Sequence, residues 1–146
     1  MSERQRGNLS TAIHAESRLD HRLLLLIKLL NTYLNHFPKH EKYGLCLQIR
    51  NAAYDTYGLV IEAQKRHYKK TALTQLDIRH EQLRMLVRLA YEMGYFAFKN
   101  GALVDQAPEQ LAERRYHAVA VGVDDVGRLI GGWIGAVMGA EPRKKQ

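Results

Sequence analysis

Apolar residues recur three and four positions apart along four separate stretches of this chain, and no stretch alternates apolar with polar residues as a half-buried strand does. Spacings of three and four place side chains on one face of an α-helix. The four stretches cover residues 17–36, 41–67, 74–98 and the region from residue 108 onward. The chain is therefore predicted to be all-α, with four amphipathic helices.

Each stretch carries one apolar stripe that we expect to face a shared core, and the last stripe alternates spacings of four and three as in a coiled coil. Gly44 and Gly58 are expected inside the second helix, at a cost of about 1 kcal/mol each relative to Ala. The stripes are Leu19, Leu23, Leu26, Leu30 and Leu34; Leu45, Ile49, Ala52, Thr56, Val60 and Ala63; Leu76, Leu83, Leu86 or Val87, Ala90, Met93 or Gly94, and Ala97; and Val119, Val123, Val126, Ile130, Trp133 and Val137.

Residues that start or stop helices separate these stretches. Pro38 ends the first, because proline pushes the preceding residue out of the α region. Asn100 and Gly101 suit the left-handed conformation that ends a helix, so they are predicted to stop the third. Pro108 suits the first position of the fourth. Helices joined by short links favour an up-down-up-down four-helix bundle.

The length of 146 residues suits one domain. We expect the bundle to occupy residues 17–140, between a polar tail at 1–16 and a basic tail at 141–146. The single cysteine, Cys46, cannot form an internal disulfide or a multi-cysteine metal site. The longest apolar run, 129–140, is about half of what spanning a bilayer requires. A cytoplasmic protein without a membrane partner is therefore predicted.

The histidine and acidic residues of this chain do not have the spacings that catalytic or metal sites require. His36 and His40 are separated by Pro38, and no Glu-x-x-His pair occurs. Asp124 and Asp125 are expected to be surface charges beside the last stripe. The remaining histidines, expected at the surface, are His14, His21, His67, His80 and His117. We predict no enzyme activity, no metal and no cofactor, and a metal-dependent enzyme ranks far behind the other hypotheses.

Basic residues outnumber acidic ones by 22 to 15, which gives a net charge of +7. Clusters of Lys and Arg near aromatic residues suit contacts with nucleic-acid phosphates and bases. A solvated face is the alternative for any one cluster, and several clusters together favour a polyanionic partner. The candidate binding residues are Arg18, Arg22, Lys65, Arg66, Lys69, Lys70, His80, Arg84 and Arg88.

Glycines recur every fourth residue in the last helix, at Gly127, Gly131, Gly135 and Gly139. Each costs nearly 1 kcal/mol of helix propensity, but the row allows another backbone to approach closely. Two explanations remain open, close packing inside one bundle and a subunit interface. In the second, Gly127, Gly131, Gly135 and Trp133 are the interface residues.

Three segments carry a family resemblance. The segment Phe37-Pro-Lys-His-Glu-Lys-Tyr-Gly-Leu-Cys-Leu-Gln-Ile-Arg50 resembles the helix 1–2 signature of the four-helix-bundle proteins encoded in intervening sequences of bacterial 23S ribosomal RNA genes. The usual Ser-Ile-Pro-x-Asn-Ile-Ala-Glu-Gly continuation is absent. The segments Leu83–Arg88 and Val126–Val137 resemble helices 3 and 4 of a related family, the accessory variability determinants of diversity-generating retroelements.

This resemblance, which covers about residues 19–137, implies a barrel-shaped homopentamer of four-helix bundles with a basic surface. Members bind the reverse transcriptase and the template-repeat RNA of the element, and they support mutagenic retrohoming without performing the chemistry. Arg84, Arg88 and Arg22 fall on family positions that matter for partner binding.

Two functions from different classes follow. The first is a non-catalytic accessory protein that binds the reverse transcriptase and RNA or DNA through basic surfaces. The alternative is an interaction protein of the intervening-sequence type with no retroelement role.

Overall fold

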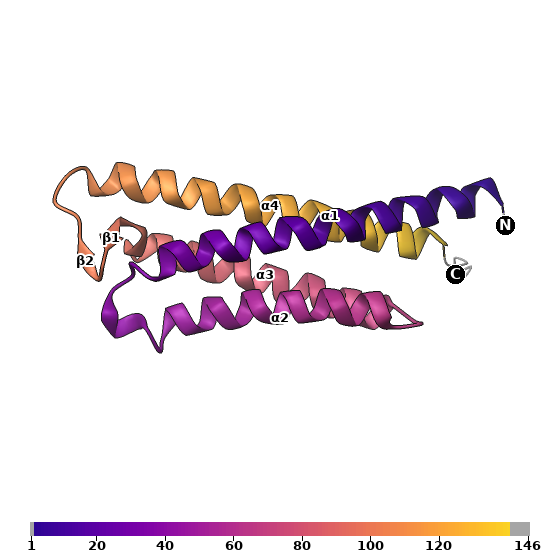
Figure 1. The fold of residues 1–146 in the computed structure, drawn as a ribbon, viewed down its shortest axis with the longest axis horizontal. Coiled ribbons are helices and arrows are strands. Elements are labelled where there is room, and N and C mark those ends of the chain that lie inside the picture. The colour runs from indigo at the N-terminus through magenta and orange to yellow at the C-terminus, as the bar shows by residue number, and fades with distance from the viewer. Residues whose placement is uncertain (1, 141–146) are drawn as a thin grey trace.

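The computed structural model describes residues 2–140, with backbone alone for residues 8–17 and 140. Within this part of the chain, four long helices lie side by side (Figure 1). They are α1 (Glu3–Leu34), α2 (Leu45–Lys65), α3 (Lys70–Glu92) and α4 (Pro108–Ala140). Two short 3-10 helices, η1 (Lys39–Glu41) and η2 (Tyr95–Ala97), lie at the corners.

The helices form a closed up-down-up-down arrangement, as predicted. The most extensive packing joins α1 to α4 and α2 to α3, and α3–α4 and α1–α2 complete the ring. Successive helices run in opposite directions, and the short α2–α3 link lies at the end of the bundle opposite the β-strands (Figure 1). The fold of the described residues is therefore mostly helical.

The core contains most residues of the predicted stripes. All the predicted stripe residues of α1 and α2 are buried, including Thr56, whose hydroxyl donates to the Ala52 carbonyl oxygen at 2.7 Å. In α4 the stripe is buried from Val119 to Trp133, and Val137 is partly buried. The third stripe differs at its end, where Met93 is 55% exposed.

The prediction of a polar tail at residues 1–16 is wrong from Glu3 onward, because α1 begins at that residue. The Ser2 hydroxyl oxygen accepts from the backbone N–H of Gln5 at 3.2 Å, and the Gln5 side chain accepts from the Ser2 N–H at 3.0 Å. This reciprocal capping satisfies two of the unpaired donors of a helix N-terminus. The expected basic tail at 141–146 lies outside the described residues.

The third helix ends at Glu92, earlier than predicted, because Gly94 takes the left-handed conformation with φ of 81°. Asn100 and Gly101 do adopt the predicted positive φ, at 51° and 84°. Their role differs, since they form the turn of a small hairpin that the helical pattern did not predict. Its antiparallel strands are β1 (Phe98–Lys99) and β2 (Ala102–Leu103), with Phe98 opposite Leu103 and Lys99 opposite Ala102.

The hairpin is tied to the end of α1. The Gly101 N–H donates to the His36 carbonyl oxygen at 3.1 Å, and the Asn100 N–H donates to His36 Nδ1 at 3.1 Å. Gly44, expected within the second helix, instead precedes α2 with φ of −102° and ψ of −113°. The α1–α2 and α3–α4 connections therefore meet at one end of the bundle.

Candidate nucleic-acid and partner interface

Arg84 and Arg88 lie on successive turns of α3 along its edge with α4, as their spacing predicts. Arg84 donates through Nε to Glu81 at 3.2 Å and through Nη1 to Asp124 of α4. The hydrogen bond to Asp124 raises the pKa of Arg84. The guanidinium is therefore permanently charged, and an incoming anion would have to compete with two carboxylates for it.

Arg88 is more exposed and combines an ion pair with aromatic contacts. Its Nη2 lies 2.7 Å from Glu92 Oε1. Its guanidinium carbon lies 5.9 Å from the ring centroids of both Tyr91 and Tyr116, which stack on each other at 4.2 Å. A charged guanidinium beside two aromatic rings suits an anionic partner that also has a flat face.

His80 does not belong to this surface. The expectation of a surface histidine is wrong here, because His80 is 3% exposed and its Nε2 lies 2.9 Å from the Val123 carbonyl oxygen of α4. Burial lowers the pKa of His80 below its ordinary 6.5. The ring is neutral at pH 7, so it cannot contribute the charge that a cationic stripe would need.

Arg18 and Arg22 line a cavity of about 260 Å³ on the α1–α4 edge. Asp125, Arg128 and Leu129 of α4 complete its lining. Arg128 donates to Asp125, so this cavity has three guanidinium groups and one carboxylate. Cations from α1 and α3 therefore lie on opposite edges of α4.

Asp124 and Asp125 are divided between these edges. Asp124 pairs with Arg84 on the α3 side, and Asp125 lies in the cavity on the α1 side. The expectation of surface charges that flank the last stripe is confirmed for both. Each of them pairs with one arginine, Asp124 with Arg84 and Asp125 with Arg128.

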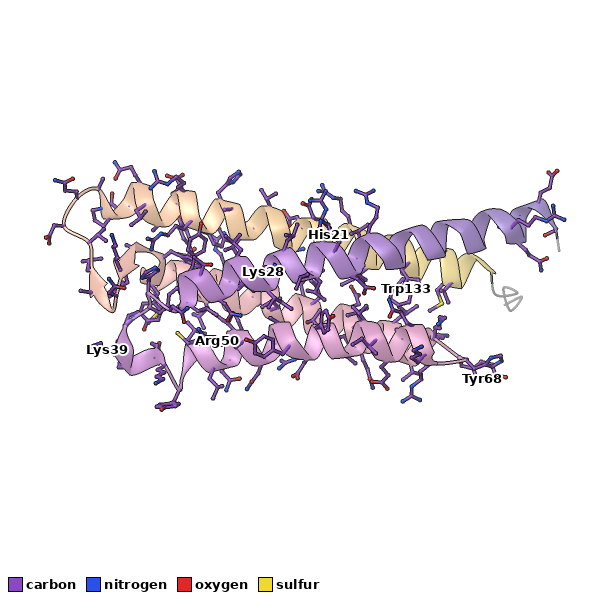
Figure 2. The ribbon with its side chains drawn as sticks, viewed as in Figure 1. His21, Lys28, Lys39, Arg50, Tyr68 and Trp133 are labelled. Carbon is purple, nitrogen blue, oxygen red and sulfur yellow. The ribbon has the colours of Figure 1, made fainter. Side chains whose placement is uncertain are left out.

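The basic residues 65–70, at the link between α2 and α3, have different roles. Lys69 Nζ donates to the carbonyl oxygens of Ala63 and Gln64 at 2.6 and 3.0 Å, which caps the C-terminus of α2. Arg66 pairs with Glu62 at 2.6 Å. Lys65 and Lys70 are exposed, and Tyr68 projects into solvent at the tip of the bundle (Figure 2).

The four residues expected at a subunit interface fall into three environments. Trp133 is fully buried inside its own chain, which contradicts its interface assignment. Gly127 packs within the bundle, since an added Cβ would lie 3.0 Å from the His80 ring. Gly131 and Gly135 are exposed, and an added Cβ would meet nothing within 4 Å.

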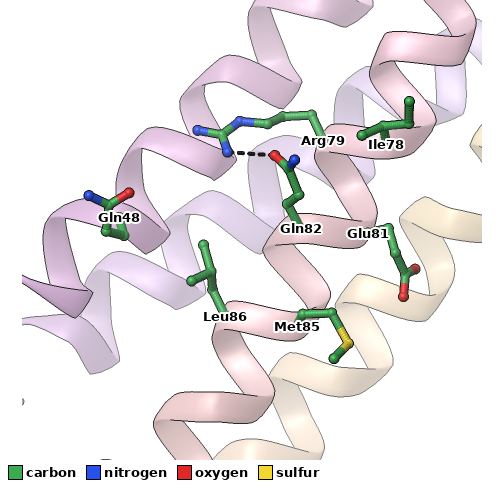
Figure 3. Close-up of a pocket in the computed structure, with 7 residues that line it drawn as sticks. All are labelled: Gln48, Ile78, Arg79, Glu81, Gln82, Met85 and Leu86. Atoms are coloured by element: carbon green, nitrogen blue, oxygen red, sulfur yellow. Dashed lines mark hydrogen bonds between the residues drawn. The ribbon is translucent and has the colours of Figure 1, made fainter.

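A groove on the α2–α3 face was not predicted. It has a volume of about 580 Å³ and is lined by Gln48 of α2 and by residues of α3 (Figure 3). Ile78 and Met85 flank it with 54% and 59% of their surfaces exposed, and Leu89 and Met93 continue this outer row. Their spacings of seven, four and four are helical, so the sequence alone could have predicted a second apolar stripe on α3, outside the core stripe.

No group of three or more His, Cys, Asp or Glu side chains within the described residues is arranged to hold a metal ion. None of the helices in the same part of the chain combines the length and apolarity needed to cross a membrane.

Comparison with known proteins gives one finding. The family profile described as bAvd-like matches residues 19–137, which span all four helices. No curated protein and no solved structure matches the chain significantly. The matched residues include both edges of α4 and the segments in which the sequence resembles the accessory variability determinants. Because the profile covers most of the 146 residues, the protein belongs to the bAvd-like family of accessory variability determinants.

Proposed function

We propose that this protein is a non-catalytic accessory protein of a diversity-generating retroelement, which binds the reverse transcriptase and the template-repeat RNA or its DNA copy and so supports mutagenic retrohoming. The family match over residues 19–137 carries this proposal. The polymerase performs the chemistry, and the bundle positions the nucleic acid.

The distribution of cations supports a phosphate-binding role for the edges of α4. Arg18 and Arg22 lie on one edge, and Arg84 and Arg88 lie on the other. Arg84 and Arg88 are paired with carboxylates in the free chain. RNA phosphates would replace those carboxylates as partners, and counterion release from the RNA would supply free energy.

We also propose that subunits assemble as a homopentamer through faces that the single chain leaves open. The exposed Gly131 and Gly135 form a flat strip on α4. The exposed row of Ile78, Met85, Leu89 and Met93 on α3 offers apolar surface of the kind that subunit contacts bury.

The test is copurification of the neighbouring reverse transcriptase with the Arg84→Glu/Arg88→Glu variant. We expect the variant to lose the polymerase while it keeps its helicity and its assembly mass. For single-stranded RNA, the slope of log affinity against log salt is about −0.7 per neutralised phosphate. Loss of two contacts should therefore flatten the slope for template-repeat RNA by about 1.4.

The matched control is Lys28→Glu/Arg114→Glu, which changes the net charge equally at two exposed positions outside the candidate binding residues. We expect it to retain the polymerase and the steeper salt slope. Equal loss of polymerase in both variants would show that net charge alone decides binding. Undiminished copurification of the Arg84/Arg88 variant would contradict the assignment of this edge and favour an interaction protein without a retroelement role.

A further inference from the structure

The corner between α1 and α2 contains a cavity that the proposed function does not use. It has a volume of about 180 Å³ and lies where the chain passes from the end of α1 through Pro38 to the start of α2. Its lining includes Asn35, Lys39, Lys42, Cys46 and Arg50. Lys39 and Arg50 lie at the same end of the bundle in Figure 2. Three cationic side chains therefore line one small cavity.

The Arg50 guanidinium is held in place by two carboxamides. Its Nε donates to Asn31 Oδ1 and its Nη2 donates to Asn35 Oδ1, both at 2.9 Å. Neither partner carries charge, so the full positive charge of Arg50 remains. Its Nη1 has no hydrogen-bond partner among the described residues. An oriented guanidinium with a spare pair of donors suits an oxyanion.

The two lysines add charge that no ion pair among the described side chains neutralises. Within the part of the chain that the structure describes, no carboxylate lies within ion-pair distance of Lys39, Lys42 or Arg50. Glu41 is the acidic residue between the lysines, but its Oε1 accepts from the Leu45 N–H at 3.2 Å. Hydrogen bonds to Tyr95 and Leu45 lower the pKa of Glu41, and its carboxylate does not line the cavity.

The helix ends at the cavity oppose each other, so the three cationic side chains carry the case for an anion. Cys46 is the second residue of α2, so the first turn of that helix borders the cavity, and the Glu41 carboxylate that accepts from the Leu45 N–H offsets the positive end of its dipole. The C-terminal end of α1 is the opposing influence. Its Leu34 carbonyl oxygen is engaged, because it accepts from the Phe37 N–H at 3.2 Å and from the Cys46 thiol at 3.6 Å.

We infer that this corner cavity is a binding site for a phosphate group, which Lys39, Lys42 and Arg50 would hold through charge-assisted hydrogen bonds. The phosphate could belong to inorganic phosphate, to the end of a nucleic-acid chain or to its backbone, and the chemistry of recognition is the same. The inference goes beyond the proposed function, since none of these residues belongs to the edges of α4.

Isothermal titration calorimetry on the full chain tests the site, with three probes at constant ionic strength. The probes are inorganic phosphate, a 5′-phosphorylated RNA hexamer and the same hexamer without the 5′-phosphate. We expect saturable binding of inorganic phosphate that Lys39→Ala/Lys42→Ala weakens about tenfold or more, given the usual strength of hydrogen bonds to charged groups. The control Lys28→Ala/Arg114→Ala removes equal charge outside the cavity and should leave this affinity unchanged.

The hexamers identify the source of the phosphate. Dependence on Lys39 and Lys42 only for the 5′-phosphorylated hexamer supports a terminal phosphate, and equal dependence for both hexamers supports the backbone. Absence of saturable binding of inorganic phosphate, together with hexamer binding that does not depend on Lys39 and Lys42, would overturn the inference, as would equal weakening in the control variant. The Arg84→Glu/Arg88→Glu variant should bind inorganic phosphate normally, so failure of the proposed function and failure of this site are distinguishable.

Discussion

The Nε2 atom of His80 lies 2.9 Å from the backbone carbonyl oxygen of Val123, which joins α3 to α4 inside the bundle. A carbonyl oxygen can only accept, so Nε2 carries the hydrogen. Burial lowers the pKa of this imidazole, with a smaller contribution in the same direction from the charge of Arg84. The hydrogen bond to Val123 and the charges of Glu81 and Asp77 act in the opposite direction. The neutral ring is therefore the form that the folded chain favours.

The first prediction concerns stability below neutral pH. The unfolded chain binds a proton at His80 near pH 6.5, and the folded chain resists it, so the free energy of unfolding should fall as pH drops below about 6.5. Urea unfolding between pH 7.5 and pH 5 measures this. His80→Gln should be less stable at pH 7.5 and should show a smaller decline across that range.

Glu41 affects the free energy of unfolding in a lower range of pH than His80 does. Its lowered pKa means that its stabilisation is lost only as pH falls below about 4.5. The absence of any decline between pH 7.5 and pH 5 would contradict the role assigned to His80.

The second prediction compares two glycines of one helix. Gly127→Ala should destabilise the chain, because its Cβ would lie 3.0 Å from His80 Cε1 and 3.2 Å from Arg84 Nη2. Gly131→Ala places its Cβ in open space and should stabilise the isolated bundle by up to about 1 kcal/mol, from helix propensity. Thermal unfolding followed by circular dichroism distinguishes the two, and equal shifts would show that Gly127 has no special packing role.

The third prediction tests the exposed glycine strip as a subunit contact. Gly131→Leu/Gly135→Leu adds bulk where the single chain has room, so helicity should remain. If subunits meet there, the assembly mass measured by light scattering should fall. The control is Ala102→Leu, which adds similar bulk at an exposed position of β2 and should leave the mass unchanged. An unchanged mass in the double variant would assign the subunit contact to another face.

The fourth prediction uses Trp133, the single tryptophan of the chain. It is fully buried, and its indole N–H has no hydrogen-bond partner among the described residues. Its fluorescence emission should be shifted to short wavelength and should resist quenching by acrylamide. The Arg84→Glu/Arg88→Glu variant should show the same spectrum if its fold is intact. Emission typical of a hydrated indole would contradict the buried position.

The fifth prediction concerns the start of α1. Ser2→Ala removes the hydroxyl that accepts from the Gln5 N–H and should destabilise the first turns of α1 by about 1 kcal/mol. Amide hydrogen exchange should rise in residues 3–8 while the rest of α1 stays protected. Unaltered exchange there would show that the cap contributes little.

The core was predictable because a helix that buries one face needs apolar residues every three or four positions. Each helix must hide one face, so the spacing of Leu19 to Leu34 or of Val119 to Trp133 identifies the inner residues without further information. His80 follows the same rule. It lies four residues after Leu76 and three before Leu83, on the inner stripe of α3. The spacing therefore indicates burial, although a polar side chain is normally expected at the surface.

The candidate interface was predictable only in part, because spacing cannot specify the partner of a charge. The spacing placed Arg84 and Arg88 on one face, but the pairing of Arg84 with Asp124 depends on how α4 is rotated against α3. Lys69 shows the same limit, since its use as a cap depends on how the chain turns after α2. The hairpin at Phe98–Leu103 was missed because two-residue strands are too short to show alternation.

The hairpin that is tied to His36 also affects the thermodynamics of that end of the molecule. Its two hydrogen bonds join the connection between α3 and α4 to His36, just after the end of α1, and the Lys39 side chain packs against Gly101. Backbone and side chains around the corner cavity are thus ordered before any ligand arrives. A ligand that binds there loses its own conformational and translational entropy, but little further entropy is lost by the protein. More of the free energy of its contacts therefore appears as binding affinity.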